Sequence, residues 1–224
     1  MDNRPKRDVL IVEDHGLVRA GMRSLLEKAA PDFCIHEAGT YDSAIAQLSS
    51  LRFELVFLDI DLGAGNTGLD ILHFLRQQEM PCRAIMLSGD DDPATVLSCL
   101  SQGASGYITK ASDDGSVFSK AIATVLNDGV YLPASILRQT ATGIADGPYG
   151  CTVESLGLAP RQCEVLYYLC QGLPNKAIAN HMHISEGTVR KSYVSDLLRF
   201  FGVARRTELI IEISRRRLKI SPPR

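Results

Sequence analysis

Residues 55–59 read L-V-F-L-D, a short apolar run that ends at a carboxylate. Runs of the same kind occur at residues 8–12 (D-V-L-I-V), 34–38, 84–87 (A-I-M-L) and 105–109. Segments with apolar residues at helical spacing separate these runs, and this alternation is typical of a parallel sheet with helices on both faces. The first part of the chain is therefore predicted to be an α/β fold with a doubly wound, five-stranded parallel sheet.

The helices expected in this part cover residues 17–26, 44–51, 69–79, 92–102 and 117–126. After residue 156 the chain shows helical spacing only, over residues 160–171, 175–181, 185–201 and 205–218. Between the two parts, residues 142–150 (T-G-I-A-D-G-P-Y-G) are rich in small residues and turn formers, which is typical of a linker. We therefore expect an α/β domain over residues 1–132, a linker over 133–156 and a small all-α domain over 157–224.

The net charge of −2 conceals two parts of opposite sign. Residues 1–150 hold 20 Asp and Glu against 12 Lys and Arg (−8), whereas residues 151–224 hold 6 acids against 12 bases (+6). This change of sign predicts different partners, a cation for the first part and a polyanion for the second.

Two kinds of location are disfavoured by the sequence. No run reaches 18 apolar residues, so no transmembrane helix is expected, and the apolar run after the basic N-terminus is too short for a signal peptide. The six cysteines are scattered without a C-x-x-C pair, which favours free thiols. We expect a cytoplasmic protein with no membrane partner.

Polar residues follow the predicted strands at their carboxyl ends, where ligands bind in open parallel sheets. These residues are Glu13, Asp14, Asp59, Ser88 and Lys110. At about 4 Å and an effective dielectric constant of about 20, two carboxylates repel by about 4 kcal/mol, and hard oxygens without Cys or His favour Mg²⁺. A carboxylate nucleophile, a metal, a hydroxyl and a lysine together predict a phosphoryl-transfer site that forms an aspartyl-phosphate.

Four stretches in this order resemble the receiver domain of bacterial response regulators. They are V-L-I-V-E-D-H (9–15), L-V-F-L-D (55–59), A-I-M-L-S-G (84–89) and G-A-S-G-Y-I-T-K (103–110). The resemblance implies a flavodoxin-like strand order and a sensor histidine kinase as phosphoryl donor.

The resemblance also implies a role for each site residue. Asp59 is the phosphoacceptor, and Ser88 and Lys110 hold the phosphoryl group. Mg²⁺ is bound by Glu13, Asp14, Asp59 and the main-chain carbonyl of Asp61. Ser88 and Tyr107 form the switch, in which Tyr107 turns inward when Ser88 moves.

The loop after Asp59 departs from the family. Where the family usually has proline four residues after the phosphoacceptor, this chain has Gly63, and the loop over residues 62–67 is one residue longer than usual. A rival interpretation of Asp59-Ile60-Asp61 is the D-x-D motif of haloacid-dehalogenase-type phosphatases. That interpretation gives Glu13 and Asp14 no function, and its later acidic pair would have to be Asp113-Asp114, where a helix should start.

The basic end resembles the LuxR-type helix-turn-helix of NarL/FixJ-class regulators, over L-A-P-R-Q-C-E-V-L (158–166), G-L-P-N-K-A-I-A (172–179), I-S-E-G-T-V-R-K (184–191) and G-V-A-R-R-T-E-L (202–209). Ser185 can cap the second helix of the motif. The first turns of that helix, with one residue of the helix before it, supply side chains suited to duplex DNA. The candidates are Lys176, Thr188, Arg190, Lys191 and Ser192.

This second helix also departs from the family, because Thr188 and Gly202 are 14 residues apart, one more than usual. The extra residue is expected either to form a bulge or to shift the end of the helix.

The two resemblances together predict a phosphorylation-dependent DNA-binding transcriptional regulator of a two-component system. We do not expect it to be a free-standing enzyme. We expect it to form a homodimer when it is phosphorylated. The alternative is a regulator that binds DNA independently of phosphorylation.

Overall fold

The computed structural model describes residues 7–63, 65–90, 92–110, 115–134, 136, 153–216 and 218–223. The chain divides into two compact units. The first consists of residues up to 91 together with 102–122, and the second of residues 92–101 together with the chain from 123 onward. Most of the linker expected over 133–156, and the pair Asp113-Asp114, lie outside the described residues.

The first unit is built on a five-stranded parallel sheet with the order β2-β1-β3-β4-β5. This confirms the predicted doubly wound fold and its flavodoxin-like strand order. The strands are β1 (Arg7–Val12), β2 (Phe33–Ala38), β3 (Leu55–Asp59), β4 (Arg83–Ser88) and β5 (Gly106–Thr109).

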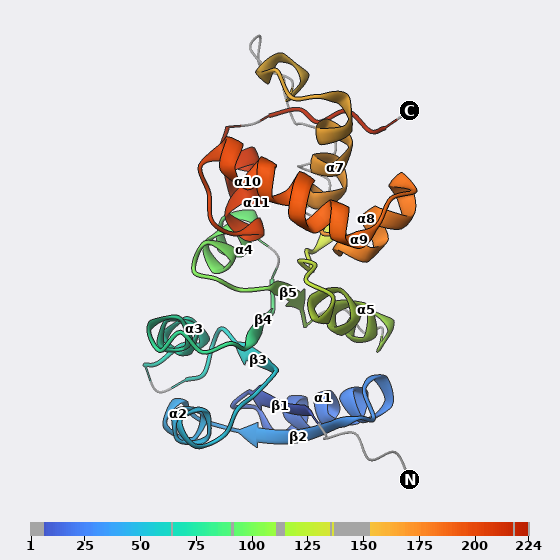
Figure 1. The fold of residues 1–224 in the computed structure, drawn as a ribbon. Helices are drawn as coiled ribbons and strands as arrows, with labels where there is room; N and C mark the ends of the chain where they lie inside the picture. The colour runs from blue at the N-terminus through green and yellow to red at the C-terminus, as the bar shows by residue number, and fades with distance from the viewer. Residues whose placement is uncertain are drawn as a thin grey trace. The chain divides into compact units, whose positions relative to one another are not determined.

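Helices cover both faces of the sheet, with α2 (Tyr41–Ser50) and α3 (Gly68–Gln77) on one face and α1 (Gly16–Ala29) and α5 (Gly115–Leu126) on the other (Figure 1). Because both faces are covered, residues 9–12 of β1 and 55–58 of β3 are fully buried whichever face they point to. This explains why the strands are continuous apolar runs rather than alternating ones.

The start of α3 is fixed tightly against the end of β3. Thr67 and Asp70 form a capping box, in which each side chain bonds to the other residue's backbone N–H. A Cβ on Gly68 would lie 2.1 Å from the main-chain oxygen of Asp59. Only glycine fits there, so the helix begins directly beside the carboxyl end of β3.

All the elements described in the second unit are helices. Its elements are α4 (Pro93–Ser101), η1 (Val153–Leu156), α7 (Pro160–Cys170), α8 (Asn175–Met182), α9 (Glu186–Thr188), η2 (Val189–Val194), α10 (Ser195–Phe201) and α11 (Arg206–Arg215). Asp92 caps α4, since its carboxylate accepts the N–H of Thr95 at 3.0 Å. Helices α7 to α11 enclose one apolar core, which includes Leu166, Leu169, Val189, Leu197 and Ile213.

The helix predicted over residues 205–218 is three residues too long at its end. Helix α11 stops at Arg215, and the oxygen of Lys219 instead accepts the backbone N–H of Val153 at 3.0 Å. Leu218 and Ile220 are buried in this non-helical segment. Because these residues are apolar, they extend the helical pattern in the sequence. In the structure they pack into the core from the non-helical segment that follows α11.

Arg206 caps the C-terminal end of α7 with its side chain. Its guanidinium donates to the main-chain oxygens of Leu169, in the last turn of α7, and of Leu173, just beyond that helix. Burial lowers the pKa of Arg206 to about 10, so the group stays charged at neutral pH.

Among the described helices, none combines the length and the apolar character that crossing a membrane requires.

Candidate functional site

The structure gathers the predicted acidic residues at the carboxyl ends of β1 and β3. Glu13 and Asp14 follow β1, and Asp59 is the last residue of β3. Carboxylate oxygens of all three, with a ring nitrogen of His15, lie within 4.8 Å of one another. Glu13 is fully buried and Asp59 is 2% exposed, so the repulsion between them is poorly screened by water.

Lys110, which follows β5, offsets this repulsion. Its Nζ lies 2.8 Å from Glu13 Oε2 and 2.8 Å from Asp59 Oδ2. Burial raises the pKa of the Asp59 carboxyl, Lys110 opposes this shift, and the charge of Glu13 adds to it. Burial alone lowers the pKa of Lys110, but the two carboxylates raise it above its ordinary value. The ammonium therefore stays charged between two carboxylates.

His15 contacts both acids of the first strand end. Its Nδ1 lies 2.7 Å from Asp14 Oδ1 and 3.1 Å from Glu13 Oε1, while its side chain is 70% exposed. This histidine is not among the site residues predicted from the sequence. Its position directly after the acidic pair was the available signal for a closer role.

The donor set fits a hard divalent cation. Glu13 Oε2, Asp14 Oδ1 and Asp59 Oδ2 are buried and complete no well-directed hydrogen bond among the described residues. The nitrogen atoms beside them are Nζ of Lys110 and Nδ1 of His15. Buried, under-coordinated carboxylate oxygens are the ligands that Mg²⁺ prefers. Asp61, whose carbonyl was the fourth expected ligand, donates its N–H to Asp59 Oδ1 at 3.4 Å.

The two predicted switch residues are linked through one backbone unit. Ser88 ends β4, and its Oγ accepts the N–H of Asp90 at 3.3 Å. The hydroxyl of Tyr107, on β5, donates to the carbonyl oxygen of the same Asp90 at 2.9 Å. The ring of Tyr107 is fully buried, so it already has the inward position that the prediction assigns to it after Ser88 has moved.

The loop after Asp59 has a conformation that the family's usual proline could not adopt. Gly63 has φ = +61°, whereas proline is confined to φ near −65°. Asp61 and Thr67 form an antiparallel bridge that closes the loop. A Cβ on Gly63 would lie 3.2 Å from Asp14 Oδ2, so the loop passes directly beside the acidic cluster.

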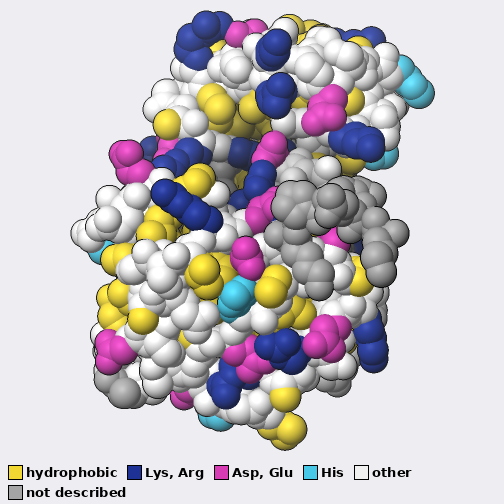
Figure 2. Space-filling view, turned by 60° about the horizontal axis from the view of Figure 1, so that its bottom comes forward, with side chains coloured by type: hydrophobic (Ala, Val, Ile, Leu, Met, Phe, Trp, Pro, Cys, Tyr) yellow, Lys and Arg dark blue, Asp and Glu magenta, His cyan; other side chains and the backbone are white. Residues whose placement is uncertain are grey.

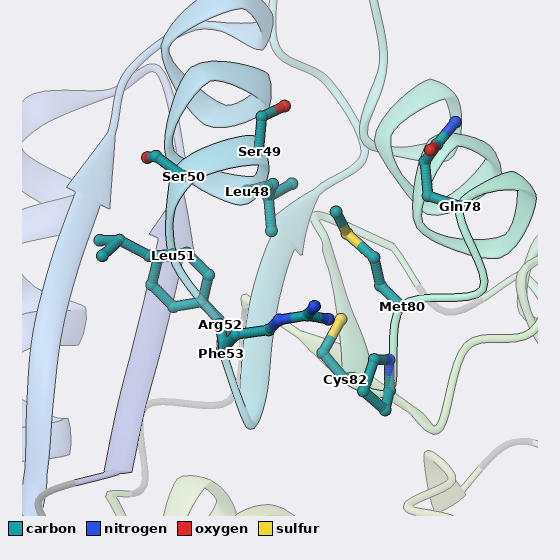
Figure 3. Close-up of a pocket in the computed structure, with 10 residues that line it drawn as sticks. Leu48, Ser49, Ser50, Leu51, Arg52, Phe53, Gln78, Met80 and Cys82 are labelled. Carbon is teal, nitrogen blue, oxygen red and sulfur yellow. The ribbon is translucent and has the colours of Figure 1, made fainter.

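A cavity of about 310 Å³ lies at the opposite, amino-terminal ends of β3 and β4. Figure 3 shows it between the ends of α2 and α3, with Leu48, Met80 and Cys82 directed toward its centre. Burial raises the pKa of the Cys82 thiol to about 11. No carboxylate lines this cavity, which separates it from the chemistry of the acidic cluster.

In the second unit, α8 and α9 are joined by a sharp turn. His183 has φ = +54°, and the N–H of Ile184 reaches back to the oxygen of Ala179 at 3.0 Å, which ends α8. Ser185 Oγ accepts the N–H of Thr188 at 3.0 Å, so the predicted cap is confirmed. The two helices and this turn form a helix-turn-helix.

The second helix of this motif, hereafter the recognition helix, comprises α9, η2 and α10 (residues 186–201). Its middle segment, η2, is a π-helix, and Gly202 ends the helix with φ = +70°. The extra residue therefore forms a bulge rather than shifting the end of the helix. All five predicted DNA-binding side chains are exposed: Lys176, Thr188, Arg190, Lys191 and Ser192. Figure 2 shows Lys and Arg side chains spread over the face in view rather than in one patch.

Two family models match the chain. The response regulator receiver domain matches residues 9–122, and the family of bacterial regulatory proteins of the luxR type matches residues 156–213. The nitrate/nitrite response regulator NarP of Escherichia coli K12 is 32% identical over 91% of this chain and 92% of its own. The glycerol metabolism activator of Pseudomonas putida is also 32% identical, over 91% and 93%.

Solved structures agree in fold. The RcsB response regulator of Salmonella typhimurium covers 94% of this chain and 99% of its own with a TM-score of 0.55, at 21% identity. A LuxR family DNA-binding response regulator from Silicibacter pomeroyi is 32% identical, with a TM-score of 0.50 over 58% of this chain and 98% of its own. None of these similarities supports a haloacid-dehalogenase-type phosphatase.

Proposed function

Since this chain belongs to the response regulators that join a receiver domain to a LuxR-type DNA-binding domain, we propose that Asp59 is the residue its sensor histidine kinase phosphorylates. The chain is a phosphorylatable, DNA-binding transcription regulator of a two-component system, not an enzyme. The observation that carries the assignment of Asp59 is its position: a buried carboxylate at the end of β3, with the ammonium of Lys110 2.8 Å away.

The proposed transfer uses this chain's own groups. A carboxylate oxygen of Asp59 attacks the phosphorus of a phosphohistidine, the phosphorus–nitrogen bond breaks, and its electron pair returns to the imidazole, which takes up a proton from water. Lys110 and the hydroxyl of Ser88 hold the oxygens of the transferred group. Both donors come from neighbouring strand ends, so they are positioned before the donor arrives.

The proposed cation is Mg²⁺, held by Glu13, Asp14, Asp59 and the main-chain oxygen of Asp61. When bound, it neutralises negative charge that develops on the phosphoryl oxygens. The three under-coordinated carboxylate oxygens support this choice. His15 Nδ1 lies 2.7 Å from one of these oxygens, Asp14 Oδ1, and the ring must turn outward to make room, which its 70% exposed side chain permits.

The proposed DNA contacts are divided between two elements. Lys176, in the first turn of α8, neutralises a phosphate. Thr188, Arg190, Lys191 and Ser192 face the major groove from the recognition helix. The family matches at 9–122 and 156–213 support a receiver domain over 1–132, a linker over 133–156 and a DNA-binding domain over 157–224.

We further propose that phosphorylation promotes a homodimer. Ser88 and Tyr107 bond to the N–H and the carbonyl of the same residue, Asp90. A shift of Ser88 toward a phosphoryl group would therefore break one of these bonds and disturb the other. Light scattering tests this step: the phosphodonor should raise the mass of the wild-type chain, and Ser88→Ala should abolish that rise.

The acceptor is tested by intact mass after treatment with a small phosphodonor and Mg²⁺. The wild-type chain should gain one phosphoryl group, and Asp59→Asn should gain none. Asp61→Asn is the matched control: its side chain is exposed and only its main chain enters the proposed site, so it should still be phosphorylated. Uptake by Asp59→Asn would refute the assignment, and loss of uptake in Asp61→Asn would show that the second carboxylate takes part.

A further inference from the structure

The recognition helix changes its winding in the middle. Residues Val189–Val194 form a π-helix between α9 and α10, and Thr188 and Ser195 on either side keep right-handed helical backbone angles. A π turn bonds residue i to i+5 and so contains one residue more than an α turn. Such turns are rare and occur frequently at functional sites.

The winding is required by the core. Val189 and Leu197 are both fully buried, and they are eight residues apart. An α-helix rotates by about 100° per residue, so eight residues would leave the two side chains about 80° apart. The π turn takes up one extra residue, so the helix rotates between Val189 and Leu197 as if they were seven residues apart. The angle between the two side chains around the helix axis is then only about 20°, and both point to the same face.

The absorbed residue lies on the outer side of the helix. Arg190, Lys191 and Ser192 are exposed in succession, and the chain returns to the core only at Tyr193 and Val194. In an α-helix with Val189 inward, the third residue after it lies about 60° from the core direction. Ser192 occupies that position in the sequence, yet its side chain is exposed.

A side chain of the helix itself stabilises the wide turn. Ser195 Oγ donates to the carbonyl oxygen of Arg190 at 3.1 Å. This hydroxyl adds one hydrogen bond that spans the wide turn, and such a bond is net stabilising. The π turn is therefore stabilised both by the burial of Val189 and Leu197 and by a local hydrogen bond.

We propose that this π turn determines sequence preference on DNA, because it adds Ser192 to the outward surface next to Arg190 and Lys191. The inference rests on the proposed DNA-binding function. Arg and Lys side chains bond to guanine in the major groove, and a serine hydroxyl bonds to either a donor or an acceptor. With the π turn, three consecutive side chains point outward, whereas an α turn would leave only Arg190 and Lys191 on that surface. The two arrangements therefore present different patterns of hydrogen-bond donors and acceptors.

The test removes the extra residue. Deletion of Ser192 places Val189 and Leu197 seven positions apart, so the helix regains α winding with the same core residues inside. The full-length phosphorylated chain and its variant are each used to select binders from a random duplex library. The deletion variant should keep its helical circular dichroism and its affinity for random DNA, and its preferred sequence should change by at least ten-fold in relative affinity.

Lys176→Ala is the matched control, because it should weaken binding to all sequences without changing the preferred one. If the folded deletion variant selects the same sequence with the same discrimination as the wild type, the proposal is overturned. If the wild type itself enriches no sequence and its binding does not depend on salt, the proposed DNA-binding function fails as well, and the two failures are thus distinguishable.

If the deletion variant does not fold, Ser192→Ala is used as the test instead, because it keeps the turn and removes only the hydroxyl. A loss of three-fold or more in discrimination at one base position then supports the proposal. An unchanged preference at every position overturns it.

Discussion

The Nζ of Lys110 lies 2.8 Å from Oδ2 of Asp59, at the carboxyl ends of two strands that β4 separates in the sheet. The same nitrogen is 2.8 Å from Glu13 Oε2. One ammonium is thus shared by two buried carboxylates. The residue that is proposed to hold the phosphoryl group therefore also offsets the repulsion between Glu13 and Asp59.

Lys110→Met is therefore expected to destabilise the chain when Mg²⁺ is absent. Removing one partner of a buried ion pair costs about 3 kcal/mol, because the remaining charges stay buried without compensation. Thermal unfolding with and without Mg²⁺ measures the effect, and Mg²⁺ should raise the melting temperature more in the variant than in the wild type. Lys120→Met, on the exposed face of α5, is the control and should change stability by less than about 0.5 kcal/mol. Equal Mg²⁺ responses in the two proteins would contradict the shared role of Lys110.

Two glycines in the loop after Asp59 allow the effect of backbone strain to be distinguished from the effect of a contact with Asp14. Gly63 and Gly65 both have positive φ, but only a Cβ on Gly63 meets a neighbour, Asp14 Oδ2 at 3.2 Å. Each alanine variant should lose about 1 kcal/mol, since an L-residue is strained in this conformation. Only Gly63→Ala should also weaken Mg²⁺ binding, by several-fold, because it displaces Asp14, a proposed ligand. Titration by calorimetry compares the two, and an equal Mg²⁺ affinity in both variants would show that the loop does not shape the cation site.

The raised pKa of Asp59 predicts how stability depends on pH in the absence of Mg²⁺. Its carboxyl holds a proton to higher pH in the folded chain than in the unfolded chain. The free energy of unfolding therefore falls as the pH rises from the ordinary carboxyl pKa of about 3.9 through the raised folded value. Asp59→Asn removes this loss and should therefore raise the melting temperature of the metal-free chain near pH 7. Asp61→Asn, whose side chain is exposed, should show no such gain, and a melting temperature lowered by Asp59→Asn would mean that Lys110 outweighs burial.

Much of the fold and the site was accessible from the sequence for physical reasons. Buried parallel strands must be apolar on both faces, so L-V-F-L-D at 55–59 reveals β3, and parallel strands end at one edge, which brings Asp59 near Glu13. Two features were not determined by the pattern. The left-handed backbone of Gly63 depends on how the longer loop closes against Thr67. The extra residue of the recognition helix could be absorbed in two ways, and only the packing of Val189 with Leu197 selects the π turn.

Lys176 offers a test of the DNA interface that is separate from sequence preference. It lies in the first turn of α8, where a positive charge is unfavourable to the helix dipole, so Lys176→Ala should not lower thermal stability. If its ammonium neutralises one phosphate, the variant should bind every duplex more weakly, and the slope of log K against log salt should fall in magnitude by about 0.9. Lys219→Ala, in the segment after α11, is the control and should leave the slope unchanged. A folding defect would lower the melting temperature, whereas a lost phosphate contact would change only the slope. If Lys176→Ala is stable and its slope is unchanged, α8 does not lie against the DNA backbone.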